Sequence, residues 1–150
     1  MSGSTSTRTT WARSASSLRG VTAQLFAYVS YRDARAALDW LAALGFSEVR
    51  RQEGSDGVVT HAEVRWGDVV LMVSGDTADH LVPPLVGDST GRGLYLRVED
   101  VDGAFERAVA AGARPVVAPE NTIWHSRRAR VLDPGGQEWS FGTYEPGVAW

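Results

Sequence analysis

The chain of 150 residues contains no cysteine. Disulfide bonds, thiolate metal sites and cysteine nucleophiles are therefore excluded. No apolar run approaches the roughly 18 residues that a membrane-spanning helix needs. The net charge is only −3, so no excess of positive charge favours nucleic acid or an anionic membrane as a partner. We therefore expect a cytoplasmic protein that binds neither nucleic acid nor membrane.

The N-terminal stretch is rich in serine, threonine and arginine. It lacks the apolar segment of a secretory signal. We expect a flexible tail over residues 1–22 and a single domain over residues 23–150. An alternative is an arm that docks on a partner, for which Trp11 is the aromatic anchor.

What the chain does have is one pattern that occurs twice. In each copy, an aspartate that can cap a helix is followed twelve residues later by a glycine that can end the helix. The pairs are Asp33 with Gly45, and Asp100 with Gly112. A hairpin turn follows 22 residues after the first glycine and 23 residues after the second. A repeat of this length is a whole supersecondary unit.

The two copies lie at about residues 23–75 and 92–144. Apolar periodicity predicts helices at 34–44 and 101–111, and a loop at 119–126. Strands are expected at residues 24–31, 46–52, 58–66, 69–74, 93–98, 115–118, 127–132 and 137–143. The prediction is an α+β fold of tandem βαβββ modules whose mixed sheet curves into a cup.

Alternation along the strands predicts which side chains face the helices. In the first hairpin, Trp66 should lie opposite Val69, and Val64 opposite Leu71, on the helix side. The face that the helices leave open would carry the following side chains: Phe26, Tyr28, Ser30, His61, Glu63, Arg65, Val70, Met72, Ser74, Gly93, Tyr95, Arg97, Arg128, Arg130, Glu138 and Ser140.

Two segments carry a resemblance to a known superfamily. They read Leu-Arg-Val-Glu-Asp-Val-Asp at residues 96–102 and Arg-Val-Leu-Asp-Pro-Gly-Gly-Gln-Glu-Trp-Ser at residues 130–140. Within tandem βαβββ modules, they resemble the vicinal oxygen chelate superfamily of glyoxalase I, bleomycin-resistance proteins and extradiol dioxygenases. The resemblance covers about residues 23–144 and is greatest to the small bleomycin-resistance-like and PhnB-like proteins. It implies the fold but not one activity, because the superfamily hosts many chemistries.

Enzymes of this superfamily hold a divalent metal on the cup face, through side chains on the first and last strand of each copy. The resemblance places these four positions at Phe26, Met72, Gly93 and Ser140. None of them offers the imidazole or carboxylate group that such an ion requires. We therefore expect no metal and no other cofactor.

Three other residues attract attention. His61 and Glu63 share the open face and could be a proton-transfer pair, two metal ligands or an ordinary polar wall. Trp124 lies in the loop before the last hairpin, where its ring could stack on a planar ligand or pack on the protein itself.

The residues predicted to bind a ligand are Phe26, Tyr28, His61, Glu63, Met72, Tyr95, Trp124 and Ser140. They favour a metal-free protein without catalytic residues that sequesters a small aromatic or drug-like molecule. One alternative is a lyase, isomerase or dioxygenase with a non-standard site at His61 and Glu63, or with acid–base work by Glu63 or Glu138. The other is a regulatory or scaffolding partner without a small ligand. An uncovered sheet face and free edge strands predict a homodimer, with Trp66 and Trp150 as candidate contacts.

Overall fold

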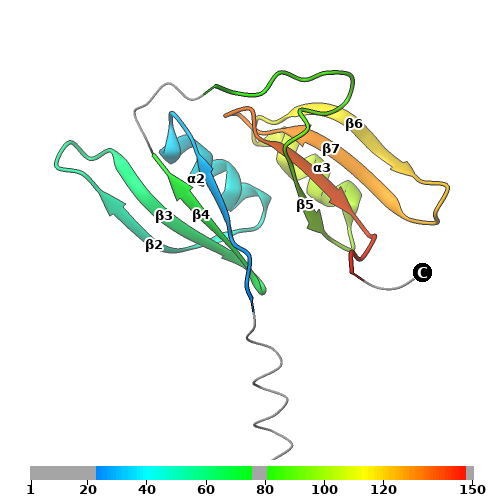
Figure 1. Ribbon diagram of the computed structural model, residues 1–150, viewed down its shortest axis with the longest axis horizontal. Helices are drawn as coiled ribbons and strands as arrows, with labels where there is room; N and C mark the ends of the chain where they lie inside the picture. Colours follow the sequence, from blue (N-terminus) through cyan, green and yellow to red (C-terminus); the bar gives the residue numbers. More distant parts are fainter. Residues whose placement is uncertain (1–22, 76–80, 148–150) are drawn as a thin grey trace, which may run out of the picture.

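The computed structural model describes residues 23–75 and 81–147. The expected tail at residues 1–22 lies outside them, as does Trp150. Figure 1 shows two βαβββ modules side by side. The first consists of β1 (Ala27–Ser30), α2 (Ala34–Leu44), β2 (Ser47–Glu53), β3 (Val59–Trp66) and β4 (Val69–Ser74). The second consists of β5 (Gly93–Arg97), α3 (Val101–Ala110), β6 (Arg114–Asn121), β7 (Arg127–Leu132) and β8 (Glu138–Gly142).

The two sheets have the same topology. Their strand orders are β1-β4-β3-β2 and β5-β8-β7-β6. In each, the first strand runs parallel to the last, and the remaining neighbours are antiparallel. Because both modules have the same strand order, the structure confirms the predicted fold of tandem βαβββ modules.

Local capping chemistry sets the ends of both helices. The side chains of Asp33 and Asp100 each accept a hydrogen bond of 2.9 Å from the backbone N–H three residues on. Past the helix ends, Gly45 and Gly112 adopt φ of 143° and 111°, which side chains with a Cβ rarely tolerate. No helix in the described residues is long and apolar enough to cross a membrane.

The hairpin register matches the predicted alternation. Trp66 pairs with Val69 and Val64 with Leu71 across β3 and β4, and the last pair is buried on the helix side. Glu63 therefore points to the open face. A register slip of one residue would have exchanged the two faces.

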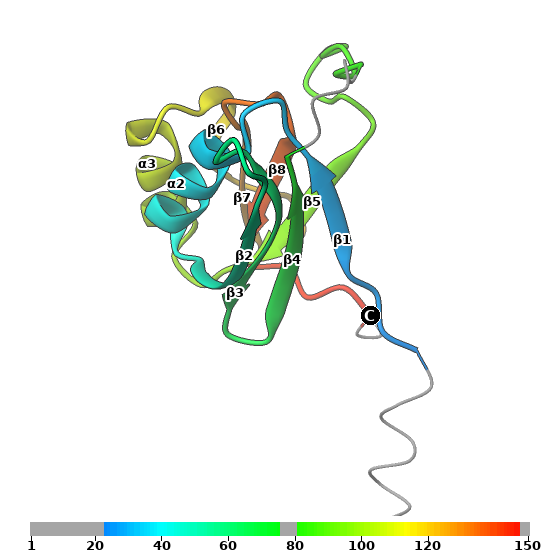
Figure 2. The ribbon, with the colours of Figure 1, turned by 90° about the vertical axis from the view of Figure 1, so that its left-hand side faces the viewer.

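Both helices cover the same side of the two sheets, as Figures 1 and 2 show together. They contact one another, and the indole Nε1 of Trp40 on α2 donates a 3.0 Å hydrogen bond to the carbonyl of Ala108 on α3. The ring of Trp139 lies 5.7 Å from that of Trp40 and 6.1 Å from that of Phe46, centroid to centroid. Trp40 and Trp139 are buried, and one core spans both modules.

A buried polar contact also joins the modules. The Tyr31 hydroxyl, just after β1, donates to Asp133 Oδ2 in the turn between β7 and β8 at 2.5 Å. Trp139 Nε1 donates to the same oxygen at 3.0 Å, while the backbone N–H groups of Gly135 and Gln137 donate to Oδ1. Burial raises the pKa of Asp133, although these hydrogen bonds act in the opposite direction.

Two predicted strands differ from the structure by three residues at one end. Strand β1 begins at Ala27 rather than at residue 24. Strand β6 continues to Asn121, whereas a loop was expected from residue 119. Its register shifts between Pro115 and Val117, and again between Val117 and Glu120, so that pairing resumes beyond the prolines. Because β6 is an outer strand, the missing proline N–H groups leave no interior gap in the sheet.

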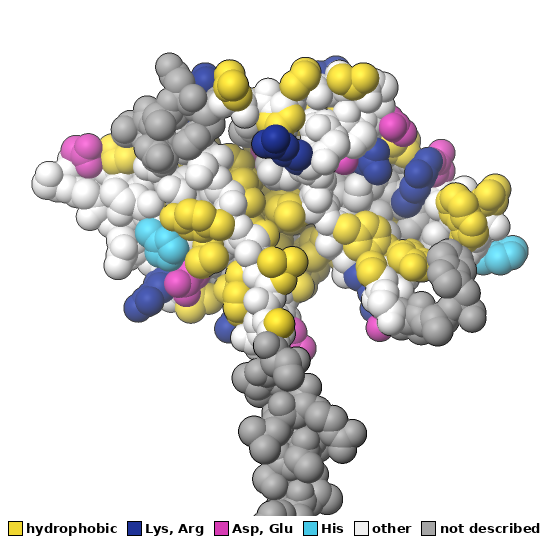
Figure 3. Space-filling model, viewed as in Figure 1, with side chains coloured by type: hydrophobic (Ala, Val, Ile, Leu, Met, Phe, Trp, Pro, Cys, Tyr) yellow, Lys and Arg dark blue, Asp and Glu magenta, His cyan; other side chains and the backbone are white. Residues whose placement is uncertain are grey.

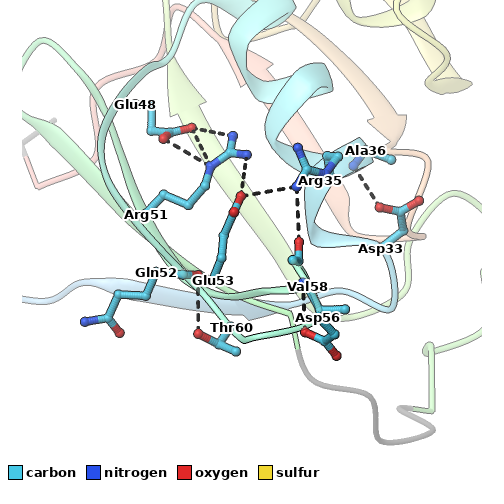
Figure 4. A network of polar contacts seen from close by, with 11 residues as sticks. Asp33, Arg35, Ala36, Glu48, Arg51, Gln52, Glu53, Asp56, Val58 and Thr60 are labelled. Atoms are coloured by element: carbon cyan, nitrogen blue, oxygen red, sulfur yellow. Dashed lines mark hydrogen bonds and ion pairs between the residues drawn. The ribbon is translucent and has the colours of Figure 1, made fainter.

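A surface network fixes the outer end of the first module, as Figure 4 shows. Arg35 on α2 donates to Glu53 at 3.1 Å and to the carbonyl of Gly57 at 3.2 Å. Arg51 donates to Glu48 at 2.7 Å. Exposed pairs of this kind contribute little to stability individually, but they hold the β2–β3 turn against α2.

Candidate ligand-binding site

The predicted ligand-binding residues divide between the two modules. Phe26, Tyr28, His61, Glu63 and Met72 belong to the first, and Tyr95, Trp124 and Ser140 belong to the second. Figure 3 looks onto the open faces and shows hydrophobic side chains over both modules and along the line between them. The structure therefore forms two half-sites of different character.

The half-site of the first module is a contiguous patch of aromatic and polar groups. The ring centroids of Tyr28 and His61 are 6.1 Å apart, and His61 Nε2 lies 3.3 Å from Glu63 Oε1. Met72 pairs in register with Tyr28 on one side and Glu63 on the other. Tyr28 also lines a hollow of about 170 Å³ between the modules, with Glu138 among its lining residues.

The second module carries a largely apolar pocket of about 330 Å³. Its lining residues are Tyr95, Thr122, Trp124, Ser126, Arg127, Arg128 and Tyr144. Tyr95 and Trp124 thus lie in one pocket although they are far apart in the sequence, and their role in binding stays a prediction. Sequence reasoning missed Tyr144, which follows the last strand and carries no pattern that would mark it.

A tight turn presents Trp124 to this pocket. The N–H of Thr122 donates to the carbonyl of Ser126 at 2.7 Å, and the Thr122 hydroxyl accepts hydrogen bonds from the N–H groups of Trp124 and Ser126. His125 adopts φ of 59°, a left-handed conformation unusual for a residue other than glycine. These hydrogen bonds define the conformation of the turn, in which Trp124 is 62% exposed.

The opposite wall of the pocket depends on a glycine. The Tyr95 hydroxyl donates to the carbonyl of Tyr144 at 2.8 Å. A Cβ at Gly142 would lie only 2.3 Å from the Tyr95 hydroxyl, so the ring can lie across β8 only because Gly142 has no side chain. Burial raises the pKa of Tyr95 further above neutral pH, so the hydroxyl stays protonated and donates.

Ser140 lies on the open face as predicted but does not line the pocket. Its hydroxyl accepts a 3.0 Å hydrogen bond from Arg130 Nε, and the two residues are paired across β7 and β8. The guanidinium group of Arg130 therefore lies against Ser140, which is one of the four positions that hold a metal in enzymes of the superfamily.

Glu138 was expected on the open face, yet it is only 3% exposed. The segment before β5 covers it: the Thr90 N–H and hydroxyl and the Ser89 hydroxyl all donate to its carboxylate. Burial alone would raise the pKa of Glu138, but these hydrogen bonds and the charge of Arg130 hold it below its usual value. A carboxylate so covered and ionised is poorly placed for acid–base work.

The four superfamily metal positions do not fit a divalent ion. Phe26, Met72 and Gly93 have no charged or imidazole donor, and an ion at Ser140 would meet the positive charge of Arg130. Within residues 23–75 and 81–147, no cluster of three or more histidine, cysteine or acidic side chains could hold a metal. That the protein binds no metal stays a prediction.

Comparison with known proteins supports the fold and the resemblance. Residues 24–141 match the glyoxalase/bleomycin resistance protein/dioxygenase superfamily. The chain is 35% identical over 116 residues to the uncharacterized protein Mb0911c of Mycobacterium bovis, covering 73% of this chain and 76% of that protein. TioX from Micromonospora sp. ML1 has a similar structure, with a TM-score of 0.65 and 28% identity over 82% of this chain and 99% of TioX. A bleomycin-binding protein in complex with bleomycin shares the fold at a TM-score of 0.57 and 20% identity, over 83% of this chain and all (100%) of that one.

Proposed function

The chain belongs to the glyoxalase/bleomycin resistance protein/dioxygenase superfamily, and we propose that it binds and sequesters a small, planar, largely apolar molecule in the cytoplasm. The observation that carries this proposal is the pocket of about 330 Å³ on the second module. Its volume falls at the lower end of the roughly 300–1,000 Å³ that is usual for small-molecule sites.

The chemistry of the walls favours a flat ligand. Tyr95 and Trp124 are 42% and 62% exposed, so their rings are uncovered and available to stack. The turn fixes the backbone at Trp124, and a hydrogen bond holds the Tyr95 ring in place before a ligand arrives. Pre-formed walls lower the entropic cost of binding.

The relatives support sequestration as the mode of action. One protein with the same fold is a bleomycin-binding protein whose structure contains bleomycin. At 20% identity, that likeness carries the fold and not the ligand. We therefore propose binding of a small molecule in general, and we infer the class of ligand from the pocket.

We further propose that the working form is a homodimer. Within the described residues, β1 and β5 each pair with only one neighbour, and Figure 1 places them at the facing inner edges of the two sheets. Leu25 and Phe26, which immediately precede β1, are 98% and 45% exposed. A second copy that covered these edges would remove apolar surface from water and protect unpaired strand edges.

Trp66 is a weaker candidate for that contact than the sequence suggested. Its ring packs edge-on against Phe46 at 5.7 Å, and a Cβ at Gly45 would lie 3.0 Å from it. Light scattering at micromolar concentration should give about twice the chain mass of 16.2 kDa. A species of 16.2 kDa under those conditions would overturn the dimer proposal without touching the pocket.

A thermal-shift screen of planar aromatic compounds tests the binding function. A compound at a hundred times its Kd adds about 2.7 kcal/mol to the stability of the folded state. For a chain of this length, that raises Tm by about 5–10 °C. Confirmed compounds are then titrated against two variants, Trp124→Ala and the matched control Ile123→Ala.

The control is drawn from the same turn. Ile123 is 83% exposed and does not line the pocket. Loss of the Trp124 ring should weaken binding by about tenfold to a hundredfold, since stacking and burial of such a face contribute about 1–3 kcal/mol. Ile123→Ala should bind as the wild type does. Equal affinities for all three proteins would show that the pocket is not the binding site.

A further inference from the structure

Arg130 lies on the open face of the second module, where hydrogen bonds hold its guanidinium group in place. Its Nε donates to the Ser140 hydroxyl at 3.0 Å, and Nη1 donates to the carbonyl of Asp88 at 2.6 Å. The carboxylates of Glu138 and Asp88 lie farther away, at 3.5 and 3.8 Å. Nη2 makes no hydrogen bond within the part of the chain that the structure describes. The side chain is 22% exposed, so it is held in place and still reachable.

The carboxylate that balances Arg130 is withdrawn from the open face. Glu138 accepts hydrogen bonds from Thr90 and Ser89 and is almost fully buried. It has room because Gly93 has no side chain: a Cβ there would lie 2.7 Å from Glu138 Oε1. A ligand on this face would therefore meet the guanidinium group of Arg130 without meeting Glu138, and the one exposed carboxylate near that group among the described residues is that of Asp88, 3.8 Å from Nη1.

Each of the other arginines around the pocket is paired with a carboxylate that is itself exposed. Arg128 and Arg127 bind the exposed carboxylates of Glu120 and Asp102. Arg97, on the same strand as Tyr95, lies 3.7 Å from the carboxylate of Glu145. Their charges are offset by acidic groups that a ligand would also meet.

Arg130 lies within reach of a ligand in the pocket. Tyr95, Ser140 and Arg130 are register partners across β5, β8 and β7, so they form one row on the open face. Arg130 is two residues from Arg128, which lines the pocket, and that spacing is about 7 Å along a strand. A drug-sized molecule on the rings of Tyr95 and Trp124 would span this distance.

We propose that the ligand of this pocket carries an anionic group, a carboxylate, sulfonate or phosphate, that binds to Nη2 of Arg130 while its planar part stacks on Trp124 and Tyr95. This inference rests on the proposed binding function. A guanidinium group binds oxyanions through short, charge-assisted hydrogen bonds, and partial burial strengthens them. Hence the site would select planar acids over neutral or cationic molecules of the same shape.

Two fluorescent probes with a common skeleton test the proposal: anilinonaphthalene sulfonate, which is anionic, and phenylnaphthylamine, which is neutral. The wild type should bind one sulfonate probe per pocket, more tightly than the neutral probe. Arg130→Met should weaken the sulfonate by about tenfold to a hundredfold and leave the neutral probe unchanged. Arg114→Met, which removes a charge from an exposed site on the outer strand β6, should change neither.

The outcomes separate the two proposals. If neither probe binds, or if Trp124→Ala leaves both affinities unchanged, then the pocket function itself is wrong. If both probes bind through Trp124 with equal affinity in the wild type, the anionic subsite is wrong and the pocket stands.

Removal of Arg130 could unfold the protein, because it would leave Glu138 without its cation. Two measurements keep the test decisive in that case. In the wild type, raising the salt concentration should weaken the sulfonate and not the neutral probe. Arg130→Lys, which keeps the charge but loses the planar fork, should bind the sulfonate with an affinity below that of the wild type. Salt-independent sulfonate binding would overturn the proposal.

Discussion

Replacing Tyr31 with phenylalanine would measure how strongly the buried contact joins the two modules. The variant removes one hydroxyl from a buried site and leaves the aromatic ring in place. Asp133 then keeps Trp139 and two backbone donors but loses its 2.5 Å hydrogen bond. A hydrogen bond to a charged acceptor contributes about 1.5–3 kcal/mol. For a chain of this length, the loss should lower Tm by about 3–12 °C.

The loss should depend on pH with a definite sign. Burial raises the folded-state pKa of Asp133, so stability falls as the pH rises through that pKa and the buried carboxyl ionises. The hydrogen bond from Tyr31 lowers this pKa and so reduces the penalty. Tyr31→Phe should therefore cost more stability at pH 7 than at about pH 3.5, where the carboxyl is largely protonated in the unfolded chain and, because its pKa is raised, more fully protonated in the folded one.

Urea unfolding followed by tryptophan fluorescence at both pH values would measure the difference. Tyr28→Phe is the matched control, because the Tyr28 side chain is mostly exposed and lies on the open face. A change below about 0.5 kcal/mol at pH 7, or an equal change at both pH values, would refute the reasoning.

Four further predictions concern the core, the Trp124 turn, the pocket wall and the metal positions. In urea unfolding, Trp139→Ala should lower the free energy of unfolding by about 3–5 kcal/mol, because it leaves a cavity in the core that both modules share. Trp124→Ala should lower it by less than about 1 kcal/mol. His125→Gly should raise stability by about 1 kcal/mol in the same assay, because glycine adopts a positive φ freely; a loss of stability would show that the His125 side chain supports the turn. Gly142→Ala should displace the Tyr95 ring and weaken planar ligands in fluorescence titration, while unchanged affinity would remove that ring from the site. Finally, elemental analysis after dialysis should find no stoichiometric divalent metal in the protein.

Much of the fold could be predicted because its determinants are local. The helix at Ala34–Leu44 has the predicted bounds, since Asp33 and Gly45 act within one turn of its ends. The faces of β3 and β4 follow from a period of two and a short turn. Strand β6 was predicted too short because proline argues against a strand, whereas bulges on an outer strand accommodate it.

The parts of the site that could not be predicted depend on contacts between distant segments. Tyr31 and Asp133 are 102 residues apart, and the sequence around either residue does not indicate that the other is its hydrogen-bond partner. Glu138 alternates with the right period for the open face, but Ser89 and Thr90 fold over it. Periodicity assigns a side chain to a face of a sheet and does not tell what another segment places on top of it.

The helical layer behind the two sheets has a consequence for how this chain can change. The large buried side chains lie between that layer and the strands, and none of the predicted ligand-binding residues is among them. Substitutions of the exposed side chains on the open faces, such as Tyr28 and Trp124, should therefore be tolerated, because surface changes usually alter stability by less than about 0.5 kcal/mol. The same scaffold could acquire a preference for a different ligand in a few mutational steps, each of them still folded.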